Sequence, residues 1–402
     1  SKNNFKILFI INVPNLRFKK YSNDWIKYKI TDLGEMRRGK SKHRPRDDEM
    51  LYGGVYPFIQ TGDIKKAYLY INEYEKTYSN YGLSQSKLWK KGTLCITIAA
   101  NIAETAILSM DACFPDSVIG WCSNNQLTNN LFIKYYFDYY KEQLKRLSVG
   151  GAQENLNLDK LEKIYFNIPS LQEQNNISNF LSKIDERIQT QIKIIENLYS
   201  QRKCIFLQLN NNYQHNKIKI NELGPVSIAN NLSKDDLVDD GRECILYGEL
   251  FTKYDLYTTH VISKTNKTYH TITSSGNDLL FPTSTTVNAI SLIKPLALCQ
   301  KDVILGGDMF SIKLNDTYDA IYISCLINYV YKKQLASKTQ GTTIVHLYYE
   351  NIKNEIIEIC DYEIQCKIAE YIKFITSKIE TEKELLNKLY LQKAYLLRNL
   401  FI

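Results

Sequence analysis

The sequence has little of what marks membrane, secreted or metal-binding proteins. Its 402 residues contain no run of about 18 apolar residues, so no membrane span is expected. Its nine cysteines form no Cys-x-x-Cys pair, and its five histidines do not stand at metal-ligand spacing. We therefore expect reduced, buried thiols, no metal site and a cytoplasmic location.

Catalytic signatures are absent as well. There is no Gly-x-x-x-x-Gly-Lys-Ser/Thr loop to cradle phosphates and no Gly-x-Gly-x-x-Gly turn for a dinucleotide. No convincing strand carries the paired acids followed by Glu-x-Lys that are typical of a nuclease. A nuclease with an unrecognised site is therefore the function we favour least. The sequence therefore predicts a protein that is not an enzyme by itself and has no catalytic residues.

What the chain does have is enough apolar sequence for real cores and a clustered positive charge. It is 44% hydrophobic and 23% charged, and its 51 basic and 43 acidic residues give a formal charge of +8. This excess permits an anionic partner. Six cations fall within ten residues: Arg37, Arg38, Lys40, Lys42, Arg44 and Arg46. We place them on a loop, where they form either a solvated surface or a set of phosphate contacts.

The strongest pattern is a repeat with an offset of 191 residues. In 173–212 and again in 364–402, apolar residues recur at alternating spacings of three and four. This period keeps one stripe of a helix facing a partner helix, as in a coiled coil. The predicted seam comprises Ile177, Leu181, Ile184, Ile188, Ile195, Leu198, Ile368, Ile372, Ile375, Ile379, Leu386 and Leu389.

Polar residues interrupt this seam at the same places in both copies. Gln191 corresponds to Glu382, and Arg202 corresponds to Lys393. Polar seam positions specify register at some cost in stability, which is the interpretation we favour over contact with a partner protein. Each helix of about 40 residues should extend roughly 60 Å at 1.5 Å per residue. A spacer of that length can set two domains at a fixed separation.

The repeat extends to the sequence before each helix. An aromatic helix is expected at Leu131–Arg146 and again at Asp319–Ala336, each followed by a Gly-containing turn, 149–153 and 339–343. We predict an α+β fold of two tandem globular domains, each followed by a long helix, with the helices packed as an antiparallel coiled coil. The predicted boundaries are 1–169 and 213–360 for the globular domains, and 170–212 and 361–402 for the helices.

These features resemble the specificity subunit of type I restriction-modification systems. The resemblance is carried by Trp25–Gly34, by Tyr56–Ile64 and above all by Gly150–Ile188. In the last stretch, a Pro-Ser-Leu-x-Glu-Gln sequence from Pro169 to Gln174 leads into the helix. The second copy departs from this pattern, because Cys360–Gln365 lacks the proline and has Ile364 where Glu173 stands.

The resemblance implies a division of labour among subunits. Each globular half would be a target recognition domain that reads one part of a bipartite double-stranded DNA sequence. The chain would bind two modification (methyltransferase) subunits and, through the complex, restriction subunits. It would hold no cofactor itself, whereas its partners would use S-adenosylmethionine, ATP and Mg. The Asn/Asp-Pro-Pro-aromatic motif of an adenine methyltransferase is absent here, as this division requires.

On this interpretation the candidate DNA-binding residues are mostly cations in both halves. They are Arg37, Arg38, Lys40, Lys42, Arg44, Arg46, Lys65, Lys66, Lys253, Lys264, Lys267 and Thr283. The polar loops Thr271–Gly276 and Thr283–Asn288 are either surface turns or elements of base readout. The alternative function is a diverged coiled-coil interaction subunit that binds methyltransferase partners without reading DNA.

Overall fold

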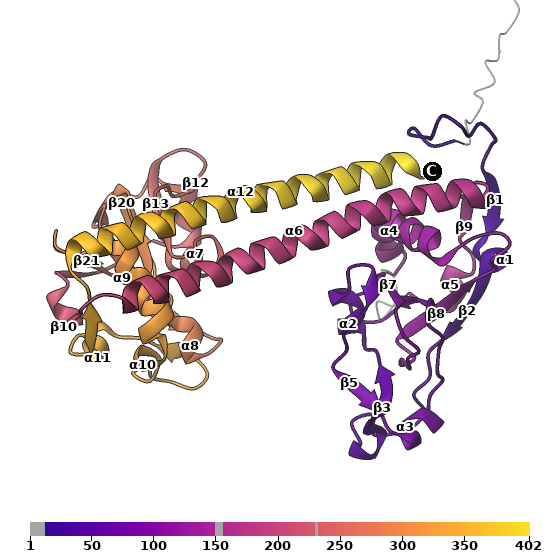
Figure 1. Ribbon diagram of the computed structural model, residues 1–402, viewed down its shortest axis with the longest axis horizontal. Coiled ribbons are helices and arrows are strands. Elements are labelled where there is room, and N and C mark those ends of the chain that lie inside the picture. Colours follow the sequence, from indigo (N-terminus) through magenta and orange to yellow (C-terminus); the bar gives the residue numbers. More distant parts are fainter. Residues whose placement is uncertain (1–12, 149–155, 230–231) are drawn as a thin grey trace, which may run out of the picture. The chain divides into compact units, whose positions relative to one another are not determined.

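Two long helices dominate the computed structural model: α6 (Leu171–Asn211) and α12 (Tyr362–Leu400). The structure describes residues 13–148, 156–229 and 232–402, so the predicted turn at 149–153 lies outside the described residues. The chain divides into two compact units, one of Ser1–Lys193 with Lys383–Ile402 and one of Ile194–Glu382. Each long helix contributes one part to each unit (Figure 1).

Unit 1 is built on a five-stranded sheet in the order β2-β8-β6-β7-β4. Its strands are β2 (Gly34–Arg38), β8 (Val118–Ser123), β6 (Leu94–Thr97), β7 (Thr105–Leu108) and β4 (Tyr70–Ile71). All neighbours are antiparallel except β4 and β7. Two antiparallel pairs accompany it: β1 (Ile26–Lys29) with β9 (Tyr165–Ile168), and β3 (Tyr52–Phe58) with β5 (Lys76–Tyr78).

Unit 2 repeats this sheet in the order β11-β21-β17-β19-β14, again with one parallel pair at the same end. Its strands are β11 (Val226–Ile228), β21 (Met309–Lys313), β17 (Asp278–Pro282), β19 (Leu296–Leu298) and β14 (Tyr257–Thr258). The pair β10 (Asn216–Lys219) and β23 (Ile356–Ile359) corresponds to β1 and β9. The repeat therefore lies in the topology as well as in the helical periodicity.

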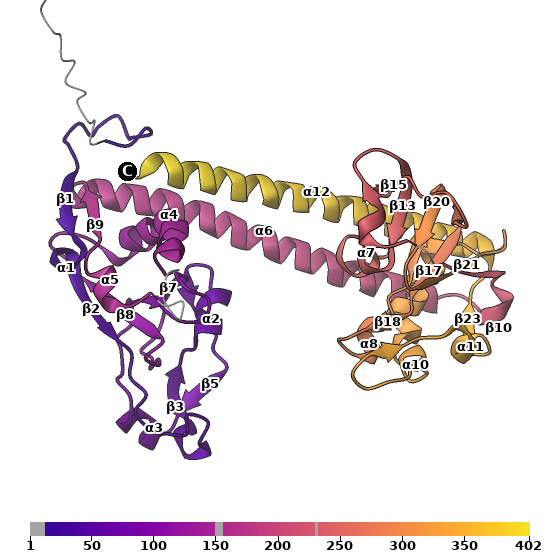
Figure 2. The same cartoon turned by 180° about the vertical axis from the view of Figure 1, so that it is seen from behind.

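The two units differ beyond the shared sheet. Unit 2 adds a second five-stranded sheet, β12-β15-β13-β20-β16, and a pair β18-β22. These strands are β12 (Leu237–Val238), β15 (Ser263–Thr265), β13 (Arg242–Leu246), β20 (Lys301–Gly306), β16 (Ile272–Ser275), β18 (Ser284–Thr285) and β22 (Val345–His346). Figure 2 labels β13, β15, β18 and β20 of these strands. The two units thus share one sheet and one strand pair and differ in their remaining strands.

Shorter helices connect these strands. Unit 1 contains α1 (Ile30–Leu33), η1 (Glu49–Leu51), α2 (Thr61–Lys66), α3 (Asn80–Ser84), α4 (Asn130–Ser148) and α5 (Leu158–Leu161). Unit 2 contains η2 (Ile220–Glu222), η3 (Lys234–Asp236), α7 (Tyr247–Thr252), α8 (Ala289–Leu292), α9 (Ala320–Leu326), α10 (Lys332–Ala336) and α11 (Tyr349–Ile352). A π-helical turn, η4 (Ile327–Tyr331), joins α9 to α10, so the second expected aromatic helix is interrupted.

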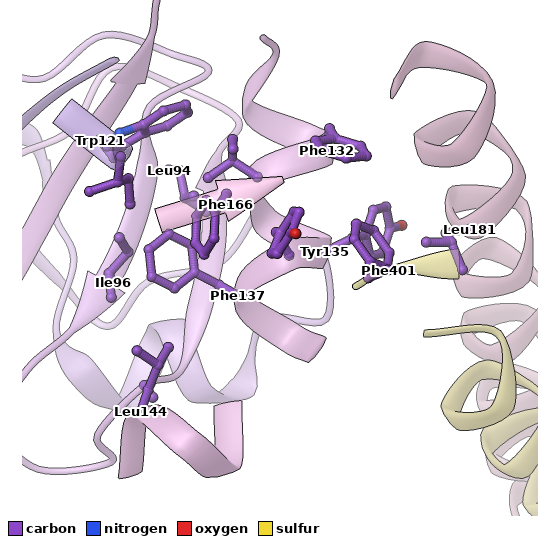
Figure 3. Packing of buried hydrophobic residues seen from close by; sticks show 14 of the residues in the cluster. Leu94, Ile96, Trp121, Phe132, Tyr135, Phe137, Leu144, Phe166, Leu181 and Phe401 are labelled. Atoms are coloured by element: carbon purple, nitrogen blue, oxygen red, sulfur yellow. The ribbon is translucent and has the colours of Figure 1, made fainter. Parts of the chain in front are cut away.

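The core of unit 1 joins its sheet to the helix pair through α4. Tyr135, Tyr136 and Phe137 of α4, within the aromatic helix expected at Leu131–Arg146, are fully buried. Phe401, just beyond α12, packs among α4 aromatics, with its ring centroid 5.3 Å from that of Phe132 (Figure 3). Leu181 of α6 belongs to the same cluster. Burial of these large side chains binds three helices and one sheet into a single core.

A glutamine at the same repeat position anchors the start of each long helix. Nε2 of Gln174 donates to the carbonyl of Pro169 at 2.9 Å, and Nε2 of Gln365 donates to that of Cys360 at 2.8 Å. Both side chains are buried, and each Oε1 accepts a bond from the segment before the aromatic helix. The helix start therefore keeps its anchor in the second copy although the proline is lost.

The helices run antiparallel within each unit. In unit 1, Asp185 of α6 faces Lys393 of α12, while Gln191, further along α6, shares a groove with Leu385 and Leu389. In unit 2, Arg202 bonds Thr376, and Phe206 lies in one cluster with Ile368 and Ile372. Of the predicted seam residues, Ile375 and Leu386 are only half-buried and the others are buried. The seam is thus least enclosed at those two positions.

The cysteines are all unbridged, but they are not all buried. Cys122 and Cys204 are exposed, whereas Cys95, Cys113, Cys244, Cys325 and Cys360 are buried. The expectation of buried thiols is therefore wrong for the first two. Within the described residues, no helix is both long and apolar enough to cross a membrane, and no three His, Cys, Asp or Glu side chains gather as metal ligands.

Candidate nucleic-acid interface

The cationic stretch of unit 1 begins on a strand rather than on a loop. Arg37 and Arg38 belong to β2, an edge strand of the sheet, and both side chains are exposed. Only the irregular segment 39–48 that follows is a loop. The placement of the whole stretch on a loop was therefore wrong for its first two arginines. Alternation of side chains along a strand explains why Arg37 points away from the face that carries the buried Met36, whereas Arg38 is exposed because it is the last residue of β2.

Several of these cations are held by contacts inside unit 1. Arg37 pairs with Glu35, and Nε of Arg38 donates to the carbonyl of Asp116 at 3.1 Å. Nη2 of Arg46 lies 2.8 Å from Oδ1 of Asp116, and both side chains of this pair are about half exposed. Such exposed pairs contribute at most about 1 kcal/mol to stability, so they leave these arginines able to exchange partners.

Arg44 stabilises the loop itself. Its Nη1 donates to the carbonyls of Ser41 at 2.7 Å and His43 at 2.8 Å. The His43 ring lies between Oδ2 of Asp48 at 2.8 Å and the hydroxyl of Tyr81 at 3.1 Å. The pKa of Asp48 is lowered, first by the backbone N–H of Met50 and then by His43. The loop that presents the cations is thus fixed by hydrogen bonds at several points.

Lys40 and Lys42 are the cations that this network leaves available. Both side chains are exposed, and within 13–148, 156–229 and 232–402 no ion pair or hydrogen bond is recorded for either ammonium group. Lys65 of α2 is exposed in the same way, whereas its neighbour Lys66 pairs with Glu75. An unpaired, exposed ammonium group can bind a phosphate without first breaking an internal contact.

A cavity of about 320 Å³, which sequence reasoning did not find, adjoins this loop. Arg46 and Asp47 line it from the loop, Tyr52 and Phe58 from β3, and Gln60 from the start of α2. The ammonium group of Lys76, on β5, lies 4.8 Å from the centre of the Tyr52 ring at its wall. Aromatic faces beside an amide, a carboxylate and two cations suit contact with nucleobase edges and phosphates.

Strand pairing explains the position of this cavity. β3 and β5 form a separate antiparallel pair, and with α3 they lie at the end of unit 1 away from α6 (Figures 1 and 2). The hydroxyl of Tyr52 donates to the carbonyl of Arg46 at 2.6 Å, which ties the loop to the strand pair. Asp63 accepts a bond from the backbone N–H of Gln60 at 2.8 Å and so stabilises the start of α2.

The predicted cations of unit 2 are each paired with an acid. Nζ of Lys253 lies 2.5 Å from Oε1 of Glu249, and Lys264 and Lys267 lie 3.4 Å from Asp240 and Asp236. The hydrogen bond to Glu249 raises the pKa of Lys253. The partners of Lys264 and Lys267 are 24 and 31 residues away in the sequence, so only the folded chain shows them. Glu249 stands four residues before Lys253, so that pair could have been found from the sequence.

The polar loops of unit 2 have mixed placements. Much of Thr271–Gly276 lies on strand β16 rather than in a turn. Thr283 follows β17, and its backbone carbonyl accepts from Leu347 at 2.9 Å. In the Thr283–Asn288 loop, Val287 and Asn288 are exposed, and Asn288 caps α8. Thr283 thus ties the end of β17 to Leu347, and Asn288 holds the start of α8.

Sequence comparison now assigns the family. The profile of the family described as type I restriction modification DNA specificity domain matches residues 22–198 and again residues 214–391. The chain belongs to this family. Its two units are therefore tandem target recognition domains, each with its helical segments.

Individual relatives agree with this assignment. A putative type I restriction enzyme specificity subunit of Haemophilus influenzae is 29% identical over 164 residues, which cover 39% of this chain and 40% of that protein. The putative MjaX specificity subunit of Methanocaldococcus jannaschii is 26% identical over 185 residues, covering 45% and 41%. The aligned stretches thus span about two fifths of these relatives' own lengths.

Solved structures share the fold. The type I restriction-modification S subunit from M. genitalium aligns with a TM-score of 0.57 at 16% identity, covering 97% of this chain and 99% of that one. A chain from a structure on complex assembly and conformational transition of the type I restriction-modification system aligns with a TM-score of 0.55 at 12% identity, covering 93% and 96%. At these identities the likeness establishes the fold of the chain.

Proposed function

We propose that this chain is the sequence-specific DNA-binding subunit of a type I restriction-modification complex, in which each recognition domain reads one half of a bipartite target. The observation that carries the proposal is the duplication itself. Both units repeat one sheet topology, one strand pair and one anchored helix start, and the family profile matches both halves. Two similar readers joined by helices suit a target of two separated parts.

The first domain supplies two kinds of contact. Lys40, Lys42 and Lys65 bind phosphates, which sets the position of the domain without specifying sequence. The cavity beside Gln60 and Asp47 supplies base readout, since a Gln amide pairs with adenine and a carboxylate accepts from the cytosine amino group. Arg46 can turn from Asp116 to the DNA at little cost, because their pair is exposed.

Partners supply the chemistry. On this proposal the chain docks two methyltransferase subunits, and through them restriction subunits, and holds no cofactor itself. S-adenosylmethionine, ATP and Mg belong to those partners. The support is the family assignment, together with a solved relative that was studied as part of an assembling type I complex.

Selection from a random pool tests the proposal. The chain, co-purified with its methyltransferase subunit, would be incubated with randomised DNA duplexes, and the bound fraction sequenced over several rounds. The proposal predicts enrichment of two short motifs separated by a fixed gap. An intact complex that enriches no motif would contradict it.

One observation favours the alternative, a diverged coiled-coil interaction subunit that binds methyltransferase partners without specific DNA readout. The predicted cations of unit 2, Lys253, Lys264 and Lys267, all pair with acids. In the same selection this alternative predicts that no motif is enriched. A bipartite motif would show that the second domain reads DNA despite these pairs.

A further inference from the structure

In both units, a buried cation at the same position of the repeat lies between the two long helices and the recognition domain. The cation is Lys393 of α12 in unit 1 and Arg202 of α6 in unit 2, which are 191 residues apart. Arg202 is 2% exposed, and the side chain of Lys393 is 13% exposed. Burying a charge is costly unless partners compensate, so the partners at each position explain why it is kept.

In unit 1, Lys393 joins both long helices to the aromatic helix of the domain. Its Nζ lies 2.9 Å from Oδ1 of Asp185 on α6 and 3.8 Å from Oδ2 of Asp138 on α4. The hydroxyl of Tyr135, also on α4, donates to Oδ2 of Asp185 at 2.7 Å. Asp138 in turn accepts from Thr105 of β7 at 3.2 Å. The contacts therefore run from the helix pair through α4 into the central sheet.

In unit 2, Arg202 makes the same connection with different partners. Its Nη1 donates to Oγ1 of Thr376 on α12 at 3.0 Å, and its Nε donates to the hydroxyl of Tyr329 in η4 at 3.2 Å. Its Nη2 lies 2.6 Å from Oδ2 of Asp255, in the segment between α7 and β14. Burial acts to lower the pKa of Arg202, but Asp255 and Tyr329 outweigh it, so the pKa is raised.

The polar cluster around Lys393 and the polar cluster around Arg202 differ in which element supplies the carboxylate. Thr376 stands 191 residues after Asp185, so unit 2 has a hydroxyl where unit 1 has the helical carboxylate. In unit 2 the carboxylate comes instead from the recognition domain, as Asp255. A cation that only set the register of the helix pair would need no partner in the domain. Both cations reach one, in addition to their contact with the other long helix.

We infer that Lys393 and Arg202 are positioning residues that fix the orientation of their own recognition domains on the helix pair, and hence each half of the DNA specificity. The inference rests on the proposed function. Base readout needs contacting groups held within about 0.5 Å and roughly 10–20° of their working geometry, whereas phosphate contacts tolerate more movement. Loss of either cluster should therefore reduce discrimination between sequences more than it reduces overall DNA affinity.

Reciprocal variants in the complex with the methyltransferase subunit test this inference. Lys393→Met and Arg202→Met remove the charge, while Lys393→Arg and Arg202→Lys keep it. Each complex would be titrated with the selected bipartite duplex, with two duplexes altered in one half each, and with an unrelated duplex. Discrimination is the ratio of the Kd for an altered duplex to the Kd for the selected one.

The expected result is a crossed pattern. Lys393→Met should lower discrimination at one half-site by about tenfold and leave the other within about twofold, and Arg202→Met should do the reverse. Affinity for the unrelated duplex should stay within about twofold for both, and the charge-keeping variants should retain most of the discrimination. Because Lys393→Met risks misfolding, Tyr135→Phe serves as a second variant that removes only the hydroxyl bonded to Asp185.

Two other results would overturn the inference. One is an equal loss of discrimination at both half-sites, or an equal loss of affinity for the unrelated duplex. Either would indicate general destabilisation of the protein. The other is unchanged discrimination in Tyr135→Phe and in both methionine variants with the complexes intact. A wild-type complex that discriminates at neither half-site is a different failure, because it removes the proposed function itself.

Discussion

Arg17 donates two parallel hydrogen bonds to Glu173, from Nε to Oε1 at 2.7 Å and from Nη2 to Oε2 at 2.8 Å. Glu173 is 1% exposed and stands in the first turn of α6. A carboxylate there is favoured by the helix dipole, and the arginine adds a charged, bidentate partner. The pair thereby ties the segment before β1 to the first turn of α6.

This pair leads to a stability prediction for unit 1. Arg17→Met leaves a buried carboxylate without its cation, which should lower the free energy of unfolding by about 3 kcal/mol. All three tryptophans, Trp25, Trp89 and Trp121, lie in unit 1, so tryptophan fluorescence in a urea titration reports on that unit. Lys19→Met, at an exposed position of the same segment, is the matched control. Equal midpoints for the two variants would refute a stabilising role for the pair.

The helical seam gives a second prediction. Ile188 of α6 is fully buried in unit 1, so Ile188→Asp places an unpaired charge there and should cost several kcal/mol. The same tryptophan titration measures this loss. Thr190→Asp, two residues further on the exposed side of the same helix, should change the midpoint little. Similar behaviour of the two variants would argue against a packed helix pair.

The available cations of the first domain lead to a prediction on salt dependence. Lys40→Ala combined with Lys42→Ala should weaken binding to all duplexes alike and reduce the slope of log K against log salt by about 2, one for each lost phosphate contact. Binding of the methyltransferase complex would be measured between low and physiological salt. Lys388→Ala, an exposed lysine on α12, is the control. An unchanged slope would remove these two lysines from the interface.

The cavity of the first domain leads to a prediction on specificity. Gln60→Ala should relax the preference at one base pair, by about 1–3 kcal/mol if the amide makes a bidentate contact. Repeating the selection with the variant complex reads this out as a single degenerate position in one half of the motif. Gln126→Ala, at an exposed site of the same unit, should leave the motif intact. Retention of every position in the Gln60 variant would exclude the amide from base readout.

The repeat and the seam could be predicted from the sequence because they rest on periodicity. The 191-residue offset indicated two similar halves, and the spacing from Ile177 to Leu209 indicated a helix paired along one face. These are local, one-dimensional signals. The structure bears out the tandem domains and the two long helices, α6 and α12.

The partners of individual polar residues could not be predicted, because they depend on contacts distant in sequence. Lys267 lies beside Asp236, and Arg202 beside Asp255 and Tyr329, only once the strands and helices are packed. The same is true of the cavity, which brings Asp47, Gln60 and Lys76 together from three segments. Sequence therefore located the cationic stretch without showing which of its cations are free.

Adenine methylation in a genome would report whether the two domains of this chain read a bipartite target. The measurement is co-expression with the methyltransferase subunit in a methylation-free host, followed by long-read mapping of modified adenines. We expect one motif in two parts with a fixed gap, methylated throughout the genome. Absence of methylation while the two proteins still form a stable complex on gel filtration would contradict it.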